Sequence, residues 1–242
     1  MKQDKVADFA KQISKGADGG EPTELIPAAT VILLRDGDEG LETLMLRKNS
    51  KIAFGGMWVF PGGRIDDEDG SSEDSMEHRA RIAAAREAME EASLDVDPAA
   101  MTWISHWTPP AMGNRRFSTW FFASPTPADD VTIDDGEITE SQWIGGQRAL
   151  DKHTAGDIEL APPTYVTLSL LARYGSVAEA MTALEPMPPR HYVTKISASG
   201  DNLVALWEGD AGYESGDADV AGPRHRLLMK KGGFEFDESG AT

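Results

Sequence analysis

The chain has no cysteine, no long apolar run and relatively little positive charge. Zero cysteines in 242 residues exclude disulfides and thiolate metal sites. No stretch reaches the roughly 18 consecutive apolar residues of a membrane-spanning helix, so we expect no membrane partner. Residues 1–20 are polar and lack the apolar centre of a secretory signal. These absences favour a cytoplasmic protein.

The deficit of positive charge also limits the class of ligand. Lysine and arginine number 23 against 41 aspartate and glutamate, a formal net charge of −18. Such a chain is not expected to bind nucleic acid, whose phosphates attract basic surfaces. Small phosphorylated ligands remain possible because a bound cation inverts the local field. An acidic protein-interaction scaffold, with no metal-dependent turnover, is one alternative interpretation.

Apolar content and proline positions predict how the chain is organised. Hydrophobic residues make up 40% of the chain, which is enough for a sizeable core. We predict a polar N-terminal lead at 1–24, a main domain at 25–185 and a C-terminal extension at 186–242 packed on the main domain. The extension begins at a proline-rich boundary, and its roughly 55 residues are marginal for independent folding. Its apolar runs at 203–207 and 226–229 are therefore expected to add strands to the main sheet.

The hydrophobic pattern predicts strands separated by helices. Strands are expected at 29–35, 41–47, 58–60, 101–107, 116–123 and 138–144. Helices are expected from just after Ser75, over 162–174, and from 176 to about 184. This arrangement indicates an α+β fold, with the C-terminal extension rich in β-structure.

The most informative segment is an acid-rich stretch of the first helix. Glu87, Glu90 and Glu91 share an arc of about 100° on a helical wheel. Like charges at this spacing destabilise a helix by about 0.2–0.5 kcal/mol per pair, and a hard divalent cation would compensate them. The adjoining side is predicted to form the buried stripe, which comprises Ile82, Ala85 and Met89.

A glycine segment upstream of the helix favours a functional interpretation of the three acids. A solvated face without a site is the ordinary interpretation of a glutamate-rich helix. Here Trp58–Phe60 is expected to form a strand that ends in a turn at Pro61-Gly62-Gly63. Glycines there allow positive φ and close approach of the backbone to a ligand. A strand, a glycine turn and a carboxylate helix together indicate a site for a metal-bound phosphate.

These residues resemble the signature of the Nudix hydrolase family. Gly63 matches its first glycine, and the second half is matched by Arg86, Glu87, Ala88, Glu90, Glu91 and Leu94. The resemblance implies an α/β/α sandwich with a mixed sheet. It also implies Mg²⁺, with Mn²⁺ as the alternative, held by Glu87, Glu90 and Glu91. Glu90, Glu91 and Arg86 are the implied catalytic residues, with Arg86 orienting the acids.

The chain departs from the signature at two places. Arg86 follows Gly63 by 23 positions where the pattern has 14, so nine residues are expected to loop out within Asp66–Ser75. Counted back from Arg86, the first glutamate of the signature falls on His78, and Glu77 beside it is a candidate substitute. Ser93 stands in place of the final glycine, which suits a left-handed helix cap. Serine is therefore expected either to adopt that conformation at a cost or to end the helix differently.

Looser similarities extend beyond the signature. Segments similar to the branch of the family that includes coenzyme A diphosphatases are Leu44–Arg47, Phe54–Gly63, Arg115–Phe122 and Pro162–Thr164. They imply a small-molecule diphosphate substrate, with coenzyme A or acyl-coenzyme A preferred. The alternatives are another nucleoside diphosphate derivative, such as an ADP-sugar, and a non-catalytic Nudix regulator that only binds its ligand. A homodimer is expected from family habit.

Further candidates complete the predicted site. The general base is Glu91 or an acid of the later loop, Glu137 or Glu140, although solvated acids without a role are the ordinary interpretation of that pair. Gly62 and Gly63 are expected to contact the substrate. Arginine side chains bind phosphates through planar forks, and the candidates are Arg64, Arg47 and Arg116. Surface ion pairs are an equally good interpretation of each arginine.

Overall fold

The computed structural model describes residues 24–50, 55–111, 116–127, 130–133 and 136–240. The chain divides into two compact units. One comprises Pro27–His106 and Thr119–Arg190 and contains the acid-rich helix. The other comprises Trp107–Ser118, His191–Thr242 and the residues up to Ile26. The predicted packing of the C-terminal extension on the main domain stays a prediction. Within the described residues, no helix is long and apolar enough to cross a membrane.

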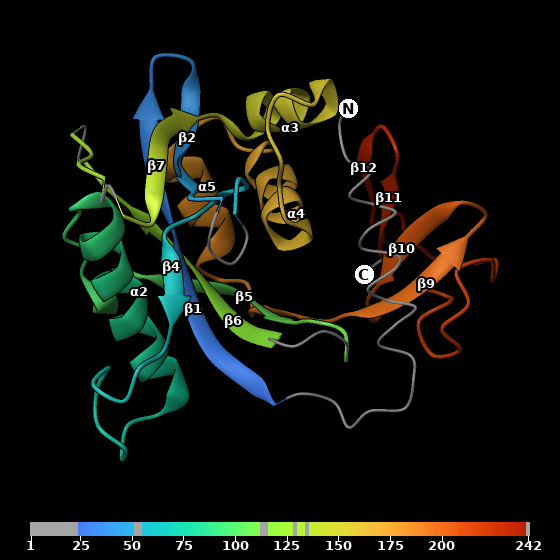
Figure 1. Ribbon diagram of the computed structural model, residues 1–242, viewed down its shortest axis with the longest axis horizontal. Helices are drawn as coiled ribbons and strands as arrows, with labels where there is room; N and C mark the ends of the chain where they lie inside the picture. The colour runs from blue at the N-terminus through green and yellow to red at the C-terminus, as the bar shows by residue number, and fades with distance from the viewer. Residues whose placement is uncertain (1–23, 51–54, 112–115, 128–129, 134–135, 241–242) are drawn as a thin grey trace. The chain divides into compact units, whose positions relative to one another are not determined.

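In the described parts of the chain, the larger of two sheets has eight strands in the order β3-β2-β1-β6-β5-β8, with β4 paired to β1 and β7 paired to β2 (Figure 1). The pairs β1–β2, β1–β4, β2–β3 and β2–β7 are antiparallel. The strands are β1 Leu25–Gly37, β2 Gly40–Lys48, β3 Trp58–Val59, β4 Gly62–Arg64, β5 Thr102–Thr108, β6 Arg116–Pro125, β7 Ile138–Ile144 and β8 Arg190–Val193.

Helices cover both faces of this sheet. Val31 and Leu33 of β1 lie in the core beneath α2, whereas Ile32 and Leu34, equally buried, face the opposite side by strand alternation. Helix α2 lies on one side of β1, and α4 and α5 lie on the other (Figure 1). The helices are α2 Met76–Ala92, α3 Gly146–Ala155, α4 Pro162–Leu171 and α5 Val177–Leu184, with a short 3₁₀ turn η1 at Pro98–Ala100. This arrangement confirms the predicted α+β class and sandwich.

The C-terminal strands form a second, four-stranded antiparallel sheet in the order β12-β11-β10-β9. These strands are β9 Lys195–Ser199, β10 Asn202–Leu206, β11 Arg226–Lys230 and β12 Gly233–Asp237. The expectation of a β-rich extension is confirmed, but the prediction that its strands extend the main sheet is wrong for these four. Strands consecutive in sequence pair with one another here, as is usual for neighbouring elements. Of the strands described within 186–240, only β8 joins the larger sheet.

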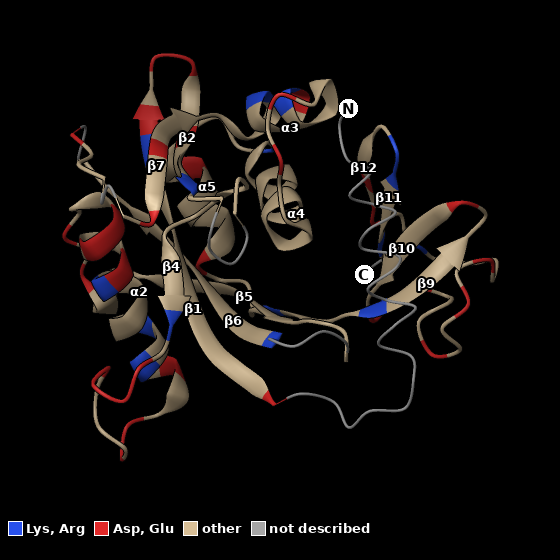
Figure 2. Cartoon of the chain, in the orientation of Figure 1, with Lys and Arg blue, Asp and Glu red and all other residues tan. Residues whose placement is uncertain are grey.

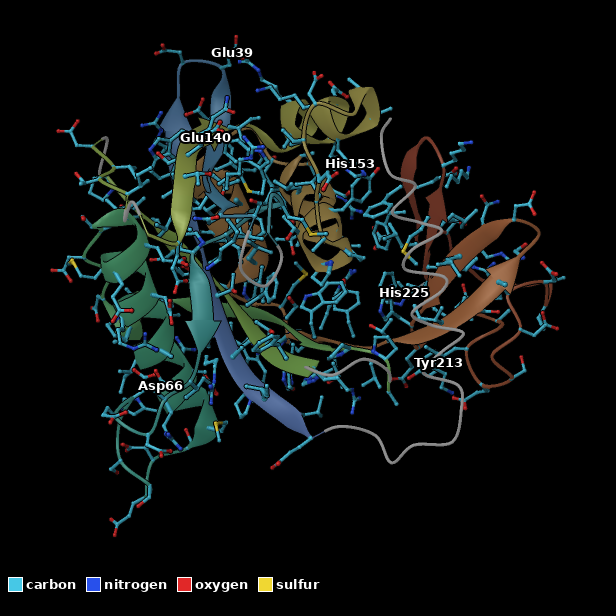
Figure 3. The ribbon with its side chains drawn as sticks, in the orientation of Figure 1. Glu39, Asp66, Glu140, His153, Tyr213 and His225 are labelled. Atoms are coloured by element: carbon cyan, nitrogen blue, oxygen red, sulfur yellow. The ribbon has the colours of Figure 1, made fainter. Side chains whose placement is uncertain are left out.

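An aromatic group and a buried ion pair organise the second unit. Trp107 stacks on Tyr192 with ring centroids 3.8 Å apart, and Trp207 meets Trp107 edge-on at 5.5 Å. Asp210 accepts hydrogen bonds from the backbone N–H of Gly212 and His225 and from two nitrogens of Arg226, at 2.6 to 2.9 Å. Tyr213 and His225, labelled in Figure 3, belong to the same unit. The ion pair joins the loop after β10 to the start of β11.

Candidate active site

Serine residues cap both ends of helix α2. The Ser75 hydroxyl accepts a hydrogen bond from the N–H of His78 at 3.2 Å, which caps the N-terminus. At the other end Ser93 adopts the left-handed conformation with φ of 56°. Its N–H donates to Met89 at 3.0 Å, and the N–H of Leu94 donates to Ala88 at 3.2 Å. Serine therefore fills the role of the expected glycine, at a conformational cost.

Alanines, rather than larger apolar residues, form the buried face of α2. Ala80, Ala83, Ala84, Ala88 and Ala92 are all fully buried. Their small side chains allow the helix to pack closely on the sheet. The predicted stripe is wrong at Met89, which is 46% exposed, while Ile82 and Ala85 are only half-buried. The close approach brings the acidic edge of the helix against β4.

The glycine segment forms a strand, where the sequence indicated a turn. Gly62–Arg64 pairs with residues 28–30 of β1. Neither Gly62 nor Gly63 has positive φ, so close approach alone requires them. A Cβ on Gly63 would lie 2.5 Å from Cδ and 2.8 Å from Oε2 of Glu87. The N–H of Gly62 donates to Oε2 of Glu91 at 3.0 Å. The predicted glycines and acids therefore meet directly.

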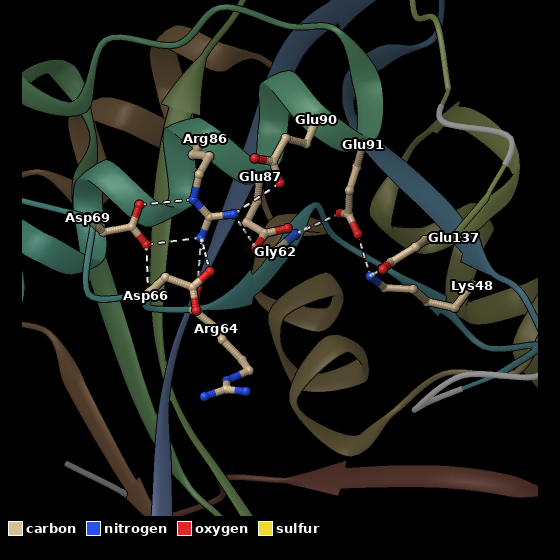
Figure 4. Close-up of polar contacts among 10 residues, drawn as sticks. All are labelled: Lys48, Gly62, Arg64, Asp66, Asp69, Arg86, Glu87, Glu90, Glu91 and Glu137. Carbon is tan, nitrogen blue, oxygen red and sulfur yellow. Dashed lines mark hydrogen bonds and ion pairs between the residues drawn. The ribbon is translucent and has the colours of Figure 1, made fainter.

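Arg86 connects the acids to the loop that precedes the helix (Figure 4). One terminal nitrogen donates to Glu87 at 2.8 Å and to Glu90 at 3.0 Å. The other donates to the carbonyl oxygen of Arg64 at 2.9 Å and to Asp69 at 3.0 Å. Nε donates to the second oxygen of Asp69 at 2.9 Å. A single planar group thus fixes two of the three acids relative to β4, which is the geometry its predicted orienting role needs.

Asp69 was missed in the sequence and is the buried partner of Arg86. It lies in the looped-out segment and is 2% exposed. Burial opposes its ionised form, but the hydrogen bonds from Arg86 and from the N–H of Asp66 hold the pKa of Asp69 below its usual value. Glu77, the suggested substitute, instead pairs with Arg81 at 2.8 Å. Counting forward from Gly63 would have found it. In the signature the first glutamate is the sixth residue after the first glycine, and Asp69 is the sixth residue after Gly63.

Lys48 was also missed, and it binds the third acid. Its ammonium group donates to Oε1 of Glu91 and lies 3.8 Å from Oε2 of Glu137. The Lys48 and Glu91 side chains are 11% and 5% exposed. Burial raises the pKa of Glu91, and the charge of Lys48 opposes that shift. Of the two loop acids proposed as a base, Glu137 thus approaches Glu91, whereas Glu140 pairs with Arg47.

The predicted arginines have different surroundings. The exposed Arg64 side chain extends away from the acids (Figure 4). Arg47 pairs with Glu140 across β2 and β7. Arg116 belongs to the other unit and donates to the carbonyl oxygens of Pro110 and Pro109 at 3.0 and 3.1 Å. These contacts give no support to substrate binding by Arg116, which stays a prediction. Arg115 and Phe54, quoted for the looser similarities, lie outside the described residues.

The donor chemistry of the cluster fits a hard divalent cation. Acidic residues gather in the C-terminal half of α2 (Figure 2). Burial raises the pKa of Glu87 to about 7, and the charges of Glu91 and Glu90 act in the same direction while Arg86 opposes them. Carboxylate oxygens are the preferred ligands of such a cation, and binding would relieve this repulsion. Among the described residues, no three acidic or histidine side chains already surround a common point. To bind a cation together, the carboxylate oxygens of Glu87, Glu90 and Glu91 would have to give up hydrogen bonds that they now accept from N–H groups.

Comparison with known proteins gives a family match and a fold match. The NUDIX domain family matches residues 24–162, more than half of the chain. A NUDIX hydrolase from Alicyclobacillus acidocaldarius is 20% identical, with a TM-score of 0.60 over 69% of this chain and 99% of that one. The NUDIX domain of Shewanella oneidensis NrtR, solved with ADP ribose, is 16% identical, with a TM-score of 0.48 over 66% and 96% of the two chains. No curated protein matches.

Proposed function

The chain belongs to the Nudix family of pyrophosphohydrolases, and from this premise we propose that it cleaves the diphosphate of coenzyme A or an acyl derivative with Mg²⁺ or Mn²⁺. One observation carries the proposal. Glu87 fits against the bare Cα of Gly63, and Glu91 accepts the N–H of Gly62. Two carboxylates thus lie against a strand whose backbone a substrate can approach, and Arg86 holds the third, Glu90, through a hydrogen bond of 3.0 Å.

Each residue of the cluster has a chemical role in this proposal. Held by Glu87, Glu90 and Glu91, a divalent cation would neutralise the diphosphate and lower the pKa of the attacking water. Arg86 keeps Glu87 and Glu90 in position. Gly62 and Gly63 would line the substrate. Arg64 and Arg47 would have to turn from their present positions, away from the acids and against Glu140, to reach the phosphates.

Proton transfer is the remaining step of the reaction. A carboxylate within hydrogen-bond reach of the water accepts its proton as the water oxygen bonds to one phosphorus. The bond from that phosphorus to the bridging oxygen breaks, and the second phosphate leaves with the electron pair. Glu137, 61% exposed and close to the Lys48–Glu91 pair, is the preferred base, with Glu91 as the alternative. Glu140 is less suited because Arg47 already engages it.

The choice of coenzyme A depends on the looser similarities alone. Another nucleoside diphosphate derivative, such as an ADP-sugar, would use the same three acids and the same glycine strand. A non-catalytic Nudix-type binding module would not need all three carboxylates, so their presence together with Arg86 favours turnover. The expected homodimer remains a proposal and can be checked by light scattering.

A substrate panel analysed by mass spectrometry tests the function. The full chain is incubated with Mg²⁺ or Mn²⁺ and with coenzyme A, acetyl-coenzyme A, ADP-ribose and an ADP-sugar. The proposal predicts 3′,5′-ADP and 4′-phosphopantetheine from coenzyme A. Cleavage of ADP-ribose without cleavage of coenzyme A would discard the preferred substrate and keep the enzyme class. Ligand binding without turnover would indicate a regulator, and neither binding nor turnover would indicate the scaffold.

A further inference from the structure

The Lys48–Glu91 pair lies inside the carboxylate cluster and is largely withdrawn from water. Lys48 is 11% exposed and Glu91 is 5% exposed. Glu137 lies 3.8 Å from the same ammonium group, so two acids share one positive charge. A pair in such surroundings interacts more strongly than an exposed ion pair. The lysine therefore supplies the positive charge that the buried end of the cluster needs when no cation is bound.

The backbone aims Lys48 at this position. The pairing of β2 with β7 shifts register between Arg47 and Lys48, and an irregularity of this kind redirects the side chain that follows it. The N–H of Lys48 donates to Met57 at 3.1 Å, and its carbonyl oxygen accepts from Gly56 at 2.9 Å. Arg47 faces Glu140 on the surface, whereas the next side chain turns inward to Glu91. The strand end thus holds the lysine in place from both sides.

Both oxygens of Glu91 are already engaged by the protein. Oε2 accepts the N–H of Gly62, and Oε1 accepts the ammonium group of Lys48. A cation bound by Glu91 would share the carboxylate with Lys48, and it would repel the ammonium group. The two positive groups therefore compete for one carboxylate. A lysine with a purely structural role elsewhere in the fold would have no such conflict.

We propose that Lys48 is a positioning residue that takes the place of the divalent cation at Glu91 and Glu137 and withdraws from Glu91 when the cation binds. The proposal rests on the proposed function, because it assumes that Glu91 is a metal ligand. In this role Lys48 lowers the affinity of the site for the cation, and it holds the buried carboxylates in position when the cation is absent.

Equilibrium binding of Mn²⁺ to the full chain without substrate, followed by electron paramagnetic resonance, tests the proposal. Lys48→Met is expected to bind Mn²⁺ about tenfold more tightly than wild type, since even an exposed ion pair is worth up to about fivefold in an equilibrium constant. Lys48→Arg keeps the positive charge beside Glu91 and is therefore expected to bind Mn²⁺ more weakly than Lys48→Met. Lys152→Met is the matched control, because that lysine donates to Gln142 at 3.2 Å, away from the acids.

Two further measurements separate this role from a structural one. Lys48→Met leaves Glu91 buried without its counter-charge, so Mn²⁺ should raise its melting temperature more than that of wild type. In the Glu91→Gln background, Lys48→Met should no longer change the Mn²⁺ affinity. Weaker or unchanged Mn²⁺ binding by Lys48→Met would overturn the proposal and leave the proposed function standing. Binding by neither wild type nor Lys48→Met would overturn both, whereas binding only by Lys48→Met would support competition.

Discussion

Replacing Gly63 by alanine should separate function from stability. The added Cβ would lie 2.5 Å from Cδ of Glu87, so that carboxylate must move. Gly63 has no positive φ, and alanine there reduces the entropy of the unfolded chain, which contributes about 0.4–1 kcal/mol of stability. Moving Glu87 off its rotamer costs about 0.5–1.5 kcal/mol. The free energy of unfolding should therefore change by less than about 1 kcal/mol, since the two terms largely cancel.

Activity and cation binding should respond much more strongly. A displacement of about 1 Å in a catalytic group can cost about a hundredfold in rate. Gly62→Ala is the informative neighbour, because its Cβ would lie 2.6 Å from the carbonyl oxygen of Ala29 and 2.9 Å from Cα of Thr30. Backbone cannot move aside as a side chain can, so Gly62→Ala should lose about 1–3 kcal/mol of stability. Urea denaturation, Mn²⁺ titration and turnover are the assays. Normal Mn²⁺ affinity and turnover in Gly63→Ala would refute the placement of Glu87.

Two other predictions concern stability. Ser93→Gly should stabilise the fold by about 0.5–1 kcal/mol. A non-glycine residue at φ of 56° costs about 1–2 kcal/mol, and glycine loses part of that gain because it increases the entropy of the unfolded chain. An unchanged or lower melting temperature would contradict the left-handed cap. Asp210 is buried, which opposes ionisation, yet Arg226 and the N–H groups of His225 and Gly212 keep its pKa lowered. Its stabilisation should therefore be present above the unfolded pKa of about 3.9 and be lost as pH falls through the lower folded value. Asp210→Asn should cost about 3–5 kcal/mol at neutral pH and should flatten the acid limb of a stability–pH curve followed by circular dichroism, whereas an unchanged limb would reject this assignment.

Local sequence patterns predicted the parts of the fold that local chemistry determines. Helix α2 begins directly after Ser75 as expected, and β1 and β2 include the apolar segments 29–35 and 41–47. Helical spacing places Glu87, Glu90 and Glu91 on one side of α2, whereas Gly63 is matched only by its resemblance to the first glycine of the signature. Capping, periodicity and short spacing act within a few residues of each other, so a single sequence displays them.

Features that depend on distant contacts were not predicted. Lys48 meets Glu91 only because β2 ends beside α2, and nothing near Lys48 in the sequence marks it. Asp69 was concealed by the extra residues before the helix. The helical wheel places Met89 in the buried stripe, but the fully buried alanines of α2 pack on the sheet and leave Met89 46% exposed. The pairing of β9–β12 into their own sheet likewise depends on partners that strand patterns do not specify.

The most direct test of the acid cluster is a Mn²⁺ titration of wild type, Glu90→Gln and Glu91→Gln, with turnover measured on the same samples. Glutamine keeps the size of each side chain and removes one negative charge. We expect wild type to bind Mn²⁺, and we expect both variants to keep the native circular dichroism spectrum while losing most of the activity. Their Mn²⁺ affinity should fall by more than the 10–100-fold typical of losing an outer-shell partner. Folded variants that bind Mn²⁺ and turn over substrate as wild type does would contradict it.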